Sequence, residues 1–247
     1  MTQLIGAFHR GLDLILPPTT LDGGHPAQGG GLSPAAFSRI TFLEAPVCDG
    51  CGAPFEHDIG LGARCTACVA RPRAFARARA ACLYDEGSRD LVLKLKHGDR
   101  PDLGTVFAGW LRRAGADLLA GADALAPVPL HPRRLLARRY NQAAEIARPL
   151  ARRTGVPYLP DSLVRVRASR GQGGRDAAGR AANVAGAFQV DPGRRSDVAG
   201  RRILLVDDVF TTGATADACA RALLAAGAAS VDVLTVARVR EAVALSI

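Results

Sequence analysis

The chain has 247 residues, of which 48% are hydrophobic and 22% are charged. This length allows one or two domains with a sizeable core, and the composition excludes a disordered, collagen-like or coiled-coil chain. Its apolar runs are far shorter than the roughly 18 residues of a membrane-spanning helix. The segment GLDLILPP near the N-terminus is too short, and interrupted by Asp13, for a signal-peptide core. We therefore expect a cytoplasmic protein that does not insert into membranes.

The net charge of +9 is unevenly distributed along the chain. Residues 131–202 contain 16 arginines and five acidic residues, so this block carries +11 and the remainder −2. Such a block indicates an anionic partner, either phosphate groups or nucleic acid. Codon bias is the alternative, because the chain has 30 arginines and two lysines. Bias explains the choice of arginine over lysine, but it does not explain the scarcity of acids.

The first third of the chain contains four closely spaced cysteines. We expect a short amphipathic helix over residues 1–16 and no strong element over residues 17–36, which are rich in Gly and Pro. A pattern of C-x2-C, 13 residues and C-x2-C then follows at Cys48, Cys51, Cys65 and Cys68. In a cytosolic protein this spacing predicts a closed, structural zinc ribbon at residues 46–72 rather than disulfides. The alternative is a set of buried free thiols, which is how we interpret Cys82 and Cys219.

The remainder of the chain predicts an α/β domain. Helices are expected at residues 86–97 and 103–120, where apolar residues recur with helical spacing. Residues 124–130, 162–166, 201–208 and 230–238 have the character of strands. A basic helical region lies at 132–153, and a helix at 213–226 has Gly227 as its C-cap. Strands that alternate with helices predict a parallel sheet with right-handed crossovers.

The most informative motif is ILLVDDVFTTGAT at residues 203–215. A buried strand brings Asp207 and Asp208 to its carboxyl end, which is where ligands bind in open α/β sheets. The small, hydroxyl-rich loop TTGAT then opens a helix and forms a nest suited to one phosphate. Gly213 removes the side chain where the phosphate approaches the backbone. Together these features fit a sugar phosphate, whereas the plainer alternative is an ordinary N-cap beside two solvated acids.

This motif resembles the site that binds 5-phosphoribosyl 1-pyrophosphate (PRPP) in type I phosphoribosyltransferases. The wider chain, over residues 46–240, resembles the ComF/GntX family, in which a zinc ribbon precedes such a domain. The shared motifs include LVLKLKHGDR (91–100), PVPLHPRR (127–134), RRYNQ (138–142) and GAF (186–188). The resemblance implies a type I phosphoribosyltransferase-like parallel sheet flanked by helices and preceded by a small N-terminal zinc ribbon. The implied domains are residues 1–45, a helix with a degenerate ribbon-like segment, the ribbon at 46–72, and the phosphoribosyltransferase-like domain at 73–247.

The resemblance also implies roles for individual residues. The two acids, Asp207 and Asp208, match the catalytic pair that contacts the ribose hydroxyls. Mg²⁺ would be carried with PRPP, largely by the pyrophosphate and ribose oxygens. The PRPP-binding segment comprises Val206, Asp207, Asp208, Thr211, Thr212, Gly213, Ala214 and Thr215. The pyrophosphate loop comprises Val128, Pro129, Leu130, His131 and Arg133, with Arg134 nearby. The flexible hood over the ligand is residues 168–183, with Ser169, Gln172, Arg175, Arg180 and Asn183. The RRYNQ motif contributes Arg138, Tyr140, Asn141 and Gln142.

Three departures from the family pattern are visible. Arg139 occupies a position where glycine is common, and the hood is unusually rich in glycine. Offset by 28 residues, Thr20 and Gly23 also align with Cys48 and Cys51. With a further gap of four residues, Ser33 and Ala36 align with Cys65 and Cys68. This pattern indicates a first ribbon half without thiols, although a chance match within a low-complexity loop is the alternative.

Three functions are compatible with these observations. The chain is a PRPP-binding protein linked to DNA uptake, competence or nucleotide metabolism; an active phosphoribosyltransferase on an unknown base or amine; or a basic nucleic-acid-binding module. The PRPP motif favours the first two. Single-stranded DNA binding usually adds stacking aromatics, and aromatics are only 5% of the residues. The sequence leaves open whether single-stranded DNA is a partner and whether the chain forms a homodimer.

Overall fold

The computed structural model describes residues 20–22, 31–97, 100–167 and 184–240. Its centre is a parallel four-stranded sheet with the strand order β1–β6–β5–β2. These strands are β1 (Ala78–Leu83), β6 (Ser230–Arg238), β5 (Arg202–Phe210) and β2 (Ala124–Pro127). The helix expected at residues 1–16 lies outside the described residues.

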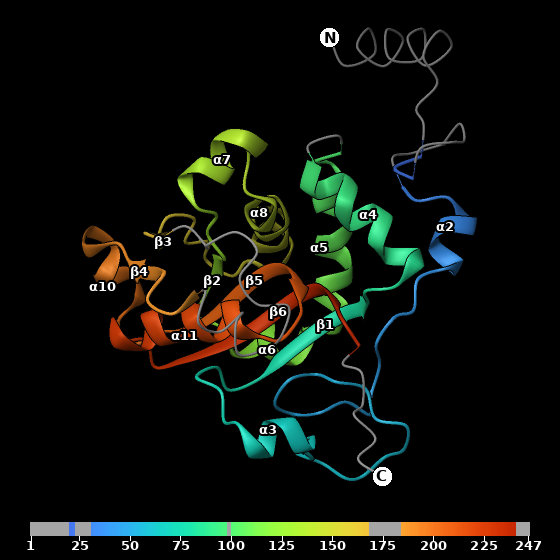
Figure 1. Ribbon diagram of the computed structural model, residues 1–247, viewed down its shortest axis with the longest axis horizontal. Helices are drawn as coiled ribbons and strands as arrows, with labels where there is room; N and C mark the ends of the chain where they lie inside the picture. The colour runs from blue at the N-terminus through green and yellow to red at the C-terminus, as the bar shows by residue number, and fades with distance from the viewer. Residues whose placement is uncertain (1–19, 23–30, 98–99, 168–183, 241–247) are drawn as a thin grey trace, which may run out of the picture.

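Helices cover both faces of the sheet (Figure 1). One face carries α4 (Glu86–His97), α5 (Leu103–Ala114), α6 (Ala116–Gly121) and α8 (Gln142–Thr154). The other face carries α11 (Ala214–Ala225). Along β5, Leu204 and Val206 belong to the first core, and Ile203 and Leu205 belong to the second. Burial on both faces explains why the strand is a continuous apolar run, and it confirms the predicted α/β class.

The helix prediction is right for α4 and wrong in detail for two longer segments. Residues 103–120 form two helices instead of one, because α5 ends at Ala114 and Gly115 separates it from α6. A Cβ atom at Gly115 would lie 2.6 Å from the Leu234 side chain, so the chain approaches the sheet closely there. Residues 132–153 likewise divide into α7 (Pro132–Arg138) and α8, with Arg139 at a left-handed φ of 65° between them. The strand expected at 124–130 is the shorter β2, which ends at Pro127.

Two predictions about strands also need correction. The strand expected at 162–166 is β3 (Leu163–Arg165), which pairs antiparallel with β4 (Phe188–Val190) outside the main sheet. The edge strand β1 was not predicted, because ARAACL is rich in alanine and has weak strand propensity. Two short helices, η1 (Pro192–Arg194) and α10 (Arg195–Val198), then lead into β5. The sequence predicts Gly227 as the C-cap of α11. In the structure the C-cap is Ala226, and Gly227 follows it with φ +100°.

Two short helices, α2 (Pro34–Ser38) and α3 (Thr66–Ala70), occupy related positions before the sheet. Although residues 17–36 were expected to hold no strong element, α2 begins inside that segment. Ser33 and Cys65 are the N-cap residues of the two helices, with φ,ψ of −64°,151° and −68°,159°. The Leu21 N–H donates to the Gly31 carbonyl at 3.0 Å, and the Asp49 N–H donates to the Ala63 carbonyl at 2.8 Å. Leu21 and Asp49 are 28 residues apart, whereas Gly31 and Ala63, like Ser33 and Cys65, are 32 residues apart. These spacings match the offset of 28 residues, with a further gap of four, that the sequence shows.

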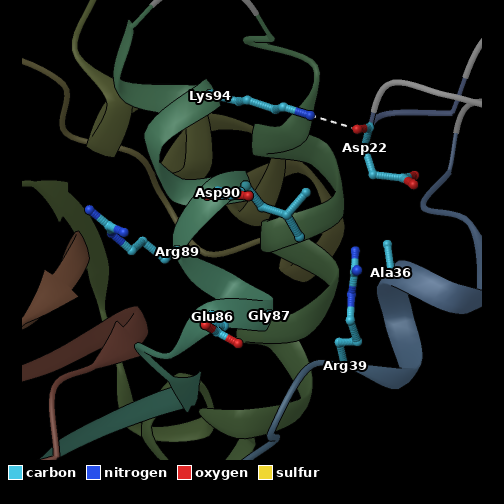
Figure 2. A pocket seen from close by; sticks show the side chains of 9 residues that line it. Asp22, Ala36, Arg39, Glu86, Gly87, Arg89, Asp90 and Lys94 are labelled. Carbon is cyan, nitrogen blue, oxygen red and sulfur yellow. Dashed lines mark hydrogen bonds between the residues drawn. The ribbon is translucent and has the colours of Figure 1, made fainter.

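The segment that contains α2 docks on α4 across a charged hollow of about 410 Å³ (Figure 2). At one end the Lys94 ammonium donates to the Asp22 carbonyl oxygen at 2.6 Å. At the other end Gly87 is required, because a Cβ atom there would lie 2.1 Å from the Arg39 carbonyl oxygen. The hollow is lined by Asp22, Ala36, Arg39, Glu86, Gly87, Arg89, Asp90, Leu91 and Lys94, so it is distinct from the Asp207–Asp208 edge. Both cations and carboxylates therefore line it.

An aromatic contact also joins this N-terminal region to the helices. The Phe42 ring packs edge-on against Trp110 of α5, with centroids 5.1 Å apart. Phe107, on the same helix, lies 5.2 Å from Trp110 on the core side. The residues before β1 are therefore held to the α5 layer by apolar as well as polar contacts.

Candidate functional site

The two acids of the ILLVDD motif lie at the carboxyl edge of the sheet. They are inside β5 rather than at its end, because the strand continues to Phe210. The Asp208 carboxylate is buried and lies 3.4 Å from the Lys96 ammonium of α4. The neighbouring Asp207 carboxylate accepts a hydrogen bond from the Asp208 N–H at 2.8 Å. Burial, followed by the Asp208 charge, raises the pKa of Asp207 to about 8.

The loop after β5, predicted to be a phosphate nest, contains a glycine in the left-handed region. Gly213 has φ +74°, and a Cβ atom there would lie 2.7 Å from the Phe210 ring, so only glycine fits. Gly213 is also the N-cap of α11, and because glycine has no side chain it gives the free N–H groups of the first turn no capping hydrogen bond. The buried atoms Thr212 Oγ1 and Asp208 Oδ2 have no hydrogen-bond partner among the described residues. Such atoms are usually satisfied by something bound, and a phosphorylated sugar would supply both donors and acceptors.

The predicted pyrophosphate loop lies beside the acids. The Val128 N–H donates to the Val206 carbonyl at 2.9 Å, which extends the pairing of β2 with β5 past the end of β2. The Asn141 amide donates to the Val128 carbonyl at 3.0 Å and accepts from the Ala143 N–H at 3.1 Å. One side chain therefore caps α8 and holds the loop. His131 is the N-cap of α7, with its Nδ1 atom accepting from the Arg133 N–H at 3.3 Å.

The structure brings most of the predicted site residues to this edge and adds one. Tyr140 of the RRYNQ motif donates its hydroxyl to the Leu95 carbonyl, which ties the α7–α8 turn to α4. Gln142 is buried, with its Oε1 atom unpartnered among the described residues. Sequence reasoning missed Lys96, although LVLKLKHGDR holds both lysines of the chain. The predicted hood residues Ser169, Gln172, Arg175, Arg180 and Asn183 lie outside the described residues.

The four cysteines of the predicted ribbon converge at one point. Their sulfur atoms all lie within 4.8 Å of one another, and the Sγ atoms of Cys51 and Cys65 are 3.7 Å apart. A zinc tetrahedron with bonds of about 2.3 Å has edges of about 3.8 Å, so the set fits a zinc ion. Burial opposes ionisation of Cys48, but its sulfur accepts from the N–H groups of Cys51 and Cys65. The hydrogen bonds prevail and lower the pKa of Cys48 to about 7.

Several known proteins are similar to this chain in sequence. The DNA utilization protein YhgH of Escherichia coli K12 is 30% identical over 209 residues, which cover 81% of this chain and 88% of that protein. The chain belongs to the ComF/GntX family. YhgH of Salmonella typhimurium is 31% identical with the same coverage. Competence protein F of Haemophilus influenzae is 29% identical, over 78% of this chain and 90% of that protein.

The family model for the phosphoribosyl transferase domain matches residues 141–245, which include the two acids and the loop at 211–215. Among solved structures, the glutamine PRPP amidotransferase from B. subtilis, complexed with ADP and GMP, is 24% identical with a TM-score of 0.34. That match covers 56% of this ComF/GntX chain and 26% of the amidotransferase. In the part of the chain that the structure describes, no helix combines the length and the apolar character needed to cross a membrane.

Proposed function

We propose that this ComF/GntX-family protein binds PRPP with Mg²⁺ and serves DNA uptake or utilization. The observation that carries the proposal is the pair of unpartnered buried oxygens, Asp208 Oδ2 and Thr212 Oγ1, beside an uncapped helix N-terminus. The relatives' names support the cellular role, and the match to the phosphoribosyl transferase model supports the ligand class.

Each part of PRPP has a counterpart in the proposed site. The carboxylates of Asp207 and Asp208 accept from the ribose hydroxyls, and the α11 N-terminus holds the 5′-phosphate. The loop from Val128 to His131 faces the pyrophosphate, and Mg²⁺ bound to PRPP offsets the charge of the two acids. Lys96 pairs with Asp208 in the free protein, so it stands where it can transfer its contact to an anionic ligand oxygen. The proposed roles of these groups are hydrogen bonding and charge balance, with no covalent step, which matches a site that positions its ligand.

Turnover requires an acceptor. In phosphoribosyl transfer, an acceptor nitrogen bonds to the anomeric carbon of PRPP while the carbon–oxygen bond to pyrophosphate breaks. The leaving group carries away the bonding electrons, and the acceptor loses a proton. Since no described residue identifies an acceptor pocket, we propose PRPP binding as the primary activity and transfer to a base or amine as the alternative.

Calorimetry with PRPP and Mg²⁺ tests the proposal, with ribose 5-phosphate and pyrophosphate as partial ligands. We expect the double variant Asp207→Asn, Asp208→Asn to lose most of the affinity while retaining its fold. The matched control is Asp191→Asn, at the N-cap of η1 away from the site. Equal affinity in the folded double variant would exclude the sugar-phosphate site. A screen for pyrophosphate release across bases then separates binding from transfer.

Nucleic-acid binding is a second candidate, supported by α7. This helix exposes Arg133 together with Leu135 and Leu136, whose exposed fractions are 42% and 82%. A basic, partly apolar surface next to a phosphate site can follow a single-stranded backbone. The proposal gains support from relatives that are named for DNA utilization and competence.

We also infer the organisation of the N-terminal third. Zinc is the proposed metal at residues 46–72, because four thiolates at tetrahedral spacing are typical of structural zinc. Residues 1–45 contain the degenerate ribbon half, and residues 73–247 form the phosphoribosyltransferase-like domain. The matching hydrogen bonds and N-caps of α2 and α3 support the repeat. Ser33 donates its N–H and hydroxyl to the two Asp22 oxygens, at 2.8 and 2.7 Å, and so a carboxylate cross-links the thiol-free half.

A further inference from the structure

Arg238, at the carboxyl end of β6, is a buried cation with no carboxylate partner among the described residues. Its exposed fraction is 1%, and by volume it is the largest fully buried side chain in the part of the chain that the structure describes. No ion pair to Arg238 occurs within residues 20–22, 31–97, 100–167 and 184–240, and its Nε atom has no hydrogen-bond partner there. Arg79, on the neighbouring strand, differs because it pairs with Asp49 and Asp117. Burial of an uncompensated charge is costly, so Arg238 calls for an anionic neighbour.

Within the described residues, the guanidinium of Arg238 makes one hydrogen bond and one aromatic contact. It donates a hydrogen bond to the carbonyl oxygen of Cys51, a member of the cysteine cluster. Its other side lies over the Phe210 ring, 5.2 Å from the centroid. Four thiolates around one Zn²⁺ carry a net charge of −2, which supplies the missing anion.

The Phe210 ring continues this connection to the phosphate nest. It supports Gly213, where a Cβ atom would lie 2.7 Å from the ring. It also packs edge-on against Phe75 in the linker between ribbon and sheet, with centroids 6.0 Å apart. In the same linker the Ala74 N–H donates to Asp217, in the first turn of α11, at 2.6 Å. The ribbon and the nest therefore meet through a few side chains and not only through the chain between them.

We propose that Arg238 is a positioning residue that serves as counter-charge to the metal-loaded cysteine cluster and, through Phe210, braces the phosphate nest against it. Ligand binding at residues 211–215 then depends on metal at residues 48–68. The ligand part of this inference rests on the proposed function, whereas the zinc and loop parts do not.

The first test measures the rate at which zinc passes from the protein to a chromophoric chelator. Removal of groups next to metal ligands typically weakens metal affinity 10- to 100-fold, so we expect Arg238→Met to release zinc about tenfold faster than the wild type. The control Arg202→Met removes an exposed arginine that pairs with Asp123 far from the ribbon, and it should not change the rate. Equal release from Arg238→Met and the wild type would overturn the counter-charge role.

The second test follows hydrogen exchange of residues 209–217 in zinc-loaded and zinc-stripped protein. Stripping should speed exchange in the wild type and have little further effect in Arg238→Met. Phe210→Leu keeps the contact between Arg238 and Cys51 but removes the aromatic ring. It should therefore retain zinc as the wild type does, while exchange at residues 209–217 should no longer respond to zinc, as in Arg238→Met. Arg79→Met removes a contact to the ribbon but does not involve Phe210. In this variant, zinc removal should therefore still speed exchange at residues 209–217. Equal acceleration in wild type, Arg238→Met and Phe210→Leu would overturn the brace.

A PRPP titration with Mg²⁺ completes the experiment. We expect zinc removal to weaken PRPP binding several-fold in the wild type and not in Arg238→Met. If zinc-loaded wild type binds no PRPP while the exchange results hold, the proposed function is wrong and the brace stands. Intact far-UV circular dichroism establishes folding for each variant, and Phe210→Leu decides the brace if Arg238→Met does not fold.

Discussion

Arg139 adopts a left-handed backbone conformation with φ 65° in the turn between α7 and α8. That conformation costs a residue with a Cβ atom roughly 1–2 kcal/mol. Glycine avoids this cost but has more freedom to lose on folding. We expect Arg139→Gly to raise the free energy of unfolding by about 1 kcal/mol, as measured by urea denaturation. The control Arg138→Gly, inside α7, should lower the free energy of unfolding. A loss of stability in Arg139→Gly would contradict the inference that Arg139 is strained.

Asp207 predicts a distinctive pH dependence. Its pKa is raised from 3.8 to about 8 in the folded protein without ligand, because burial and Asp208 disfavour the charged form. The folded state therefore keeps a proton that the unfolded state has lost, and stability falls as the pH rises through this window. Asn at position 207 does not titrate. The free energy of unfolding of Asp207→Asn, relative to that of the wild type, should therefore increase as the pH rises from 3.8 to about 8. Denaturation curves across this range test the prediction, and a constant difference would contradict it.

Local motifs reveal some residues of the proposed site and hide others. Asp207, Asp208 and Gly213 lie within one contiguous string, so a single reading of the sequence places them together. Lys96 lies more than a hundred residues earlier and reaches Asp208 only because α4 packs over the same edge. The contact between Arg238 and Cys51 spans 187 residues and belongs to no motif. Such pairs depend on tertiary packing, which one sequence does not encode locally.

Among the elements, α4 was predictable because its apolar residues Leu91, Val92 and Leu95 recur with helical spacing. The edge strand β1 was not, because its alanines are buried by pairing with β6 and by helices that come later in the chain. The strand at 163–165 was found but assigned to the wrong sheet, since periodicity does not specify a pairing partner. The break at Gly115 depends on Leu234, which is distant in sequence.

The proposed pair of ribbon halves predicts a definite metal content. Cys48, Cys51, Cys65 and Cys68 form one complete set of thiols, whereas the segment proposed as the thiol-free half is cross-linked by hydrogen bonds between Ser33 and Asp22. We expect one zinc per chain by metal analysis of protein purified under reducing conditions without chelator. Replacement of any one of the four cysteines by serine should release it. Two zincs per chain would contradict the degenerate repeat, and none would contradict the ribbon.

The whole molecule carries its charge asymmetrically, and this predicts how it meets nucleic acid. If the basic block at residues 131–202 contacts the DNA backbone, the logarithm of affinity should fall linearly with the logarithm of salt concentration, with a slope of about −0.7 per phosphate for single strands. Titrations of a labelled single strand at several salt concentrations measure the slope. Arg133→Gln with Arg138→Gln should reduce it. If the affinity does not change with salt concentration, the arginines of this block serve PRPP binding and solvation instead of DNA binding.

Trp110, the single tryptophan of the chain, is packed between Phe107 of its own helix and Phe42 from the region before β1. Its indole ring is thus in contact with the segment that follows α2 and with the core of the domain. Intrinsic fluorescence excited at the indole band reports on this junction without any label. A shift in emission that precedes the loss of helical circular dichroism would mark separate release of the N-terminal region, and simultaneous transitions would mark one cooperative unit.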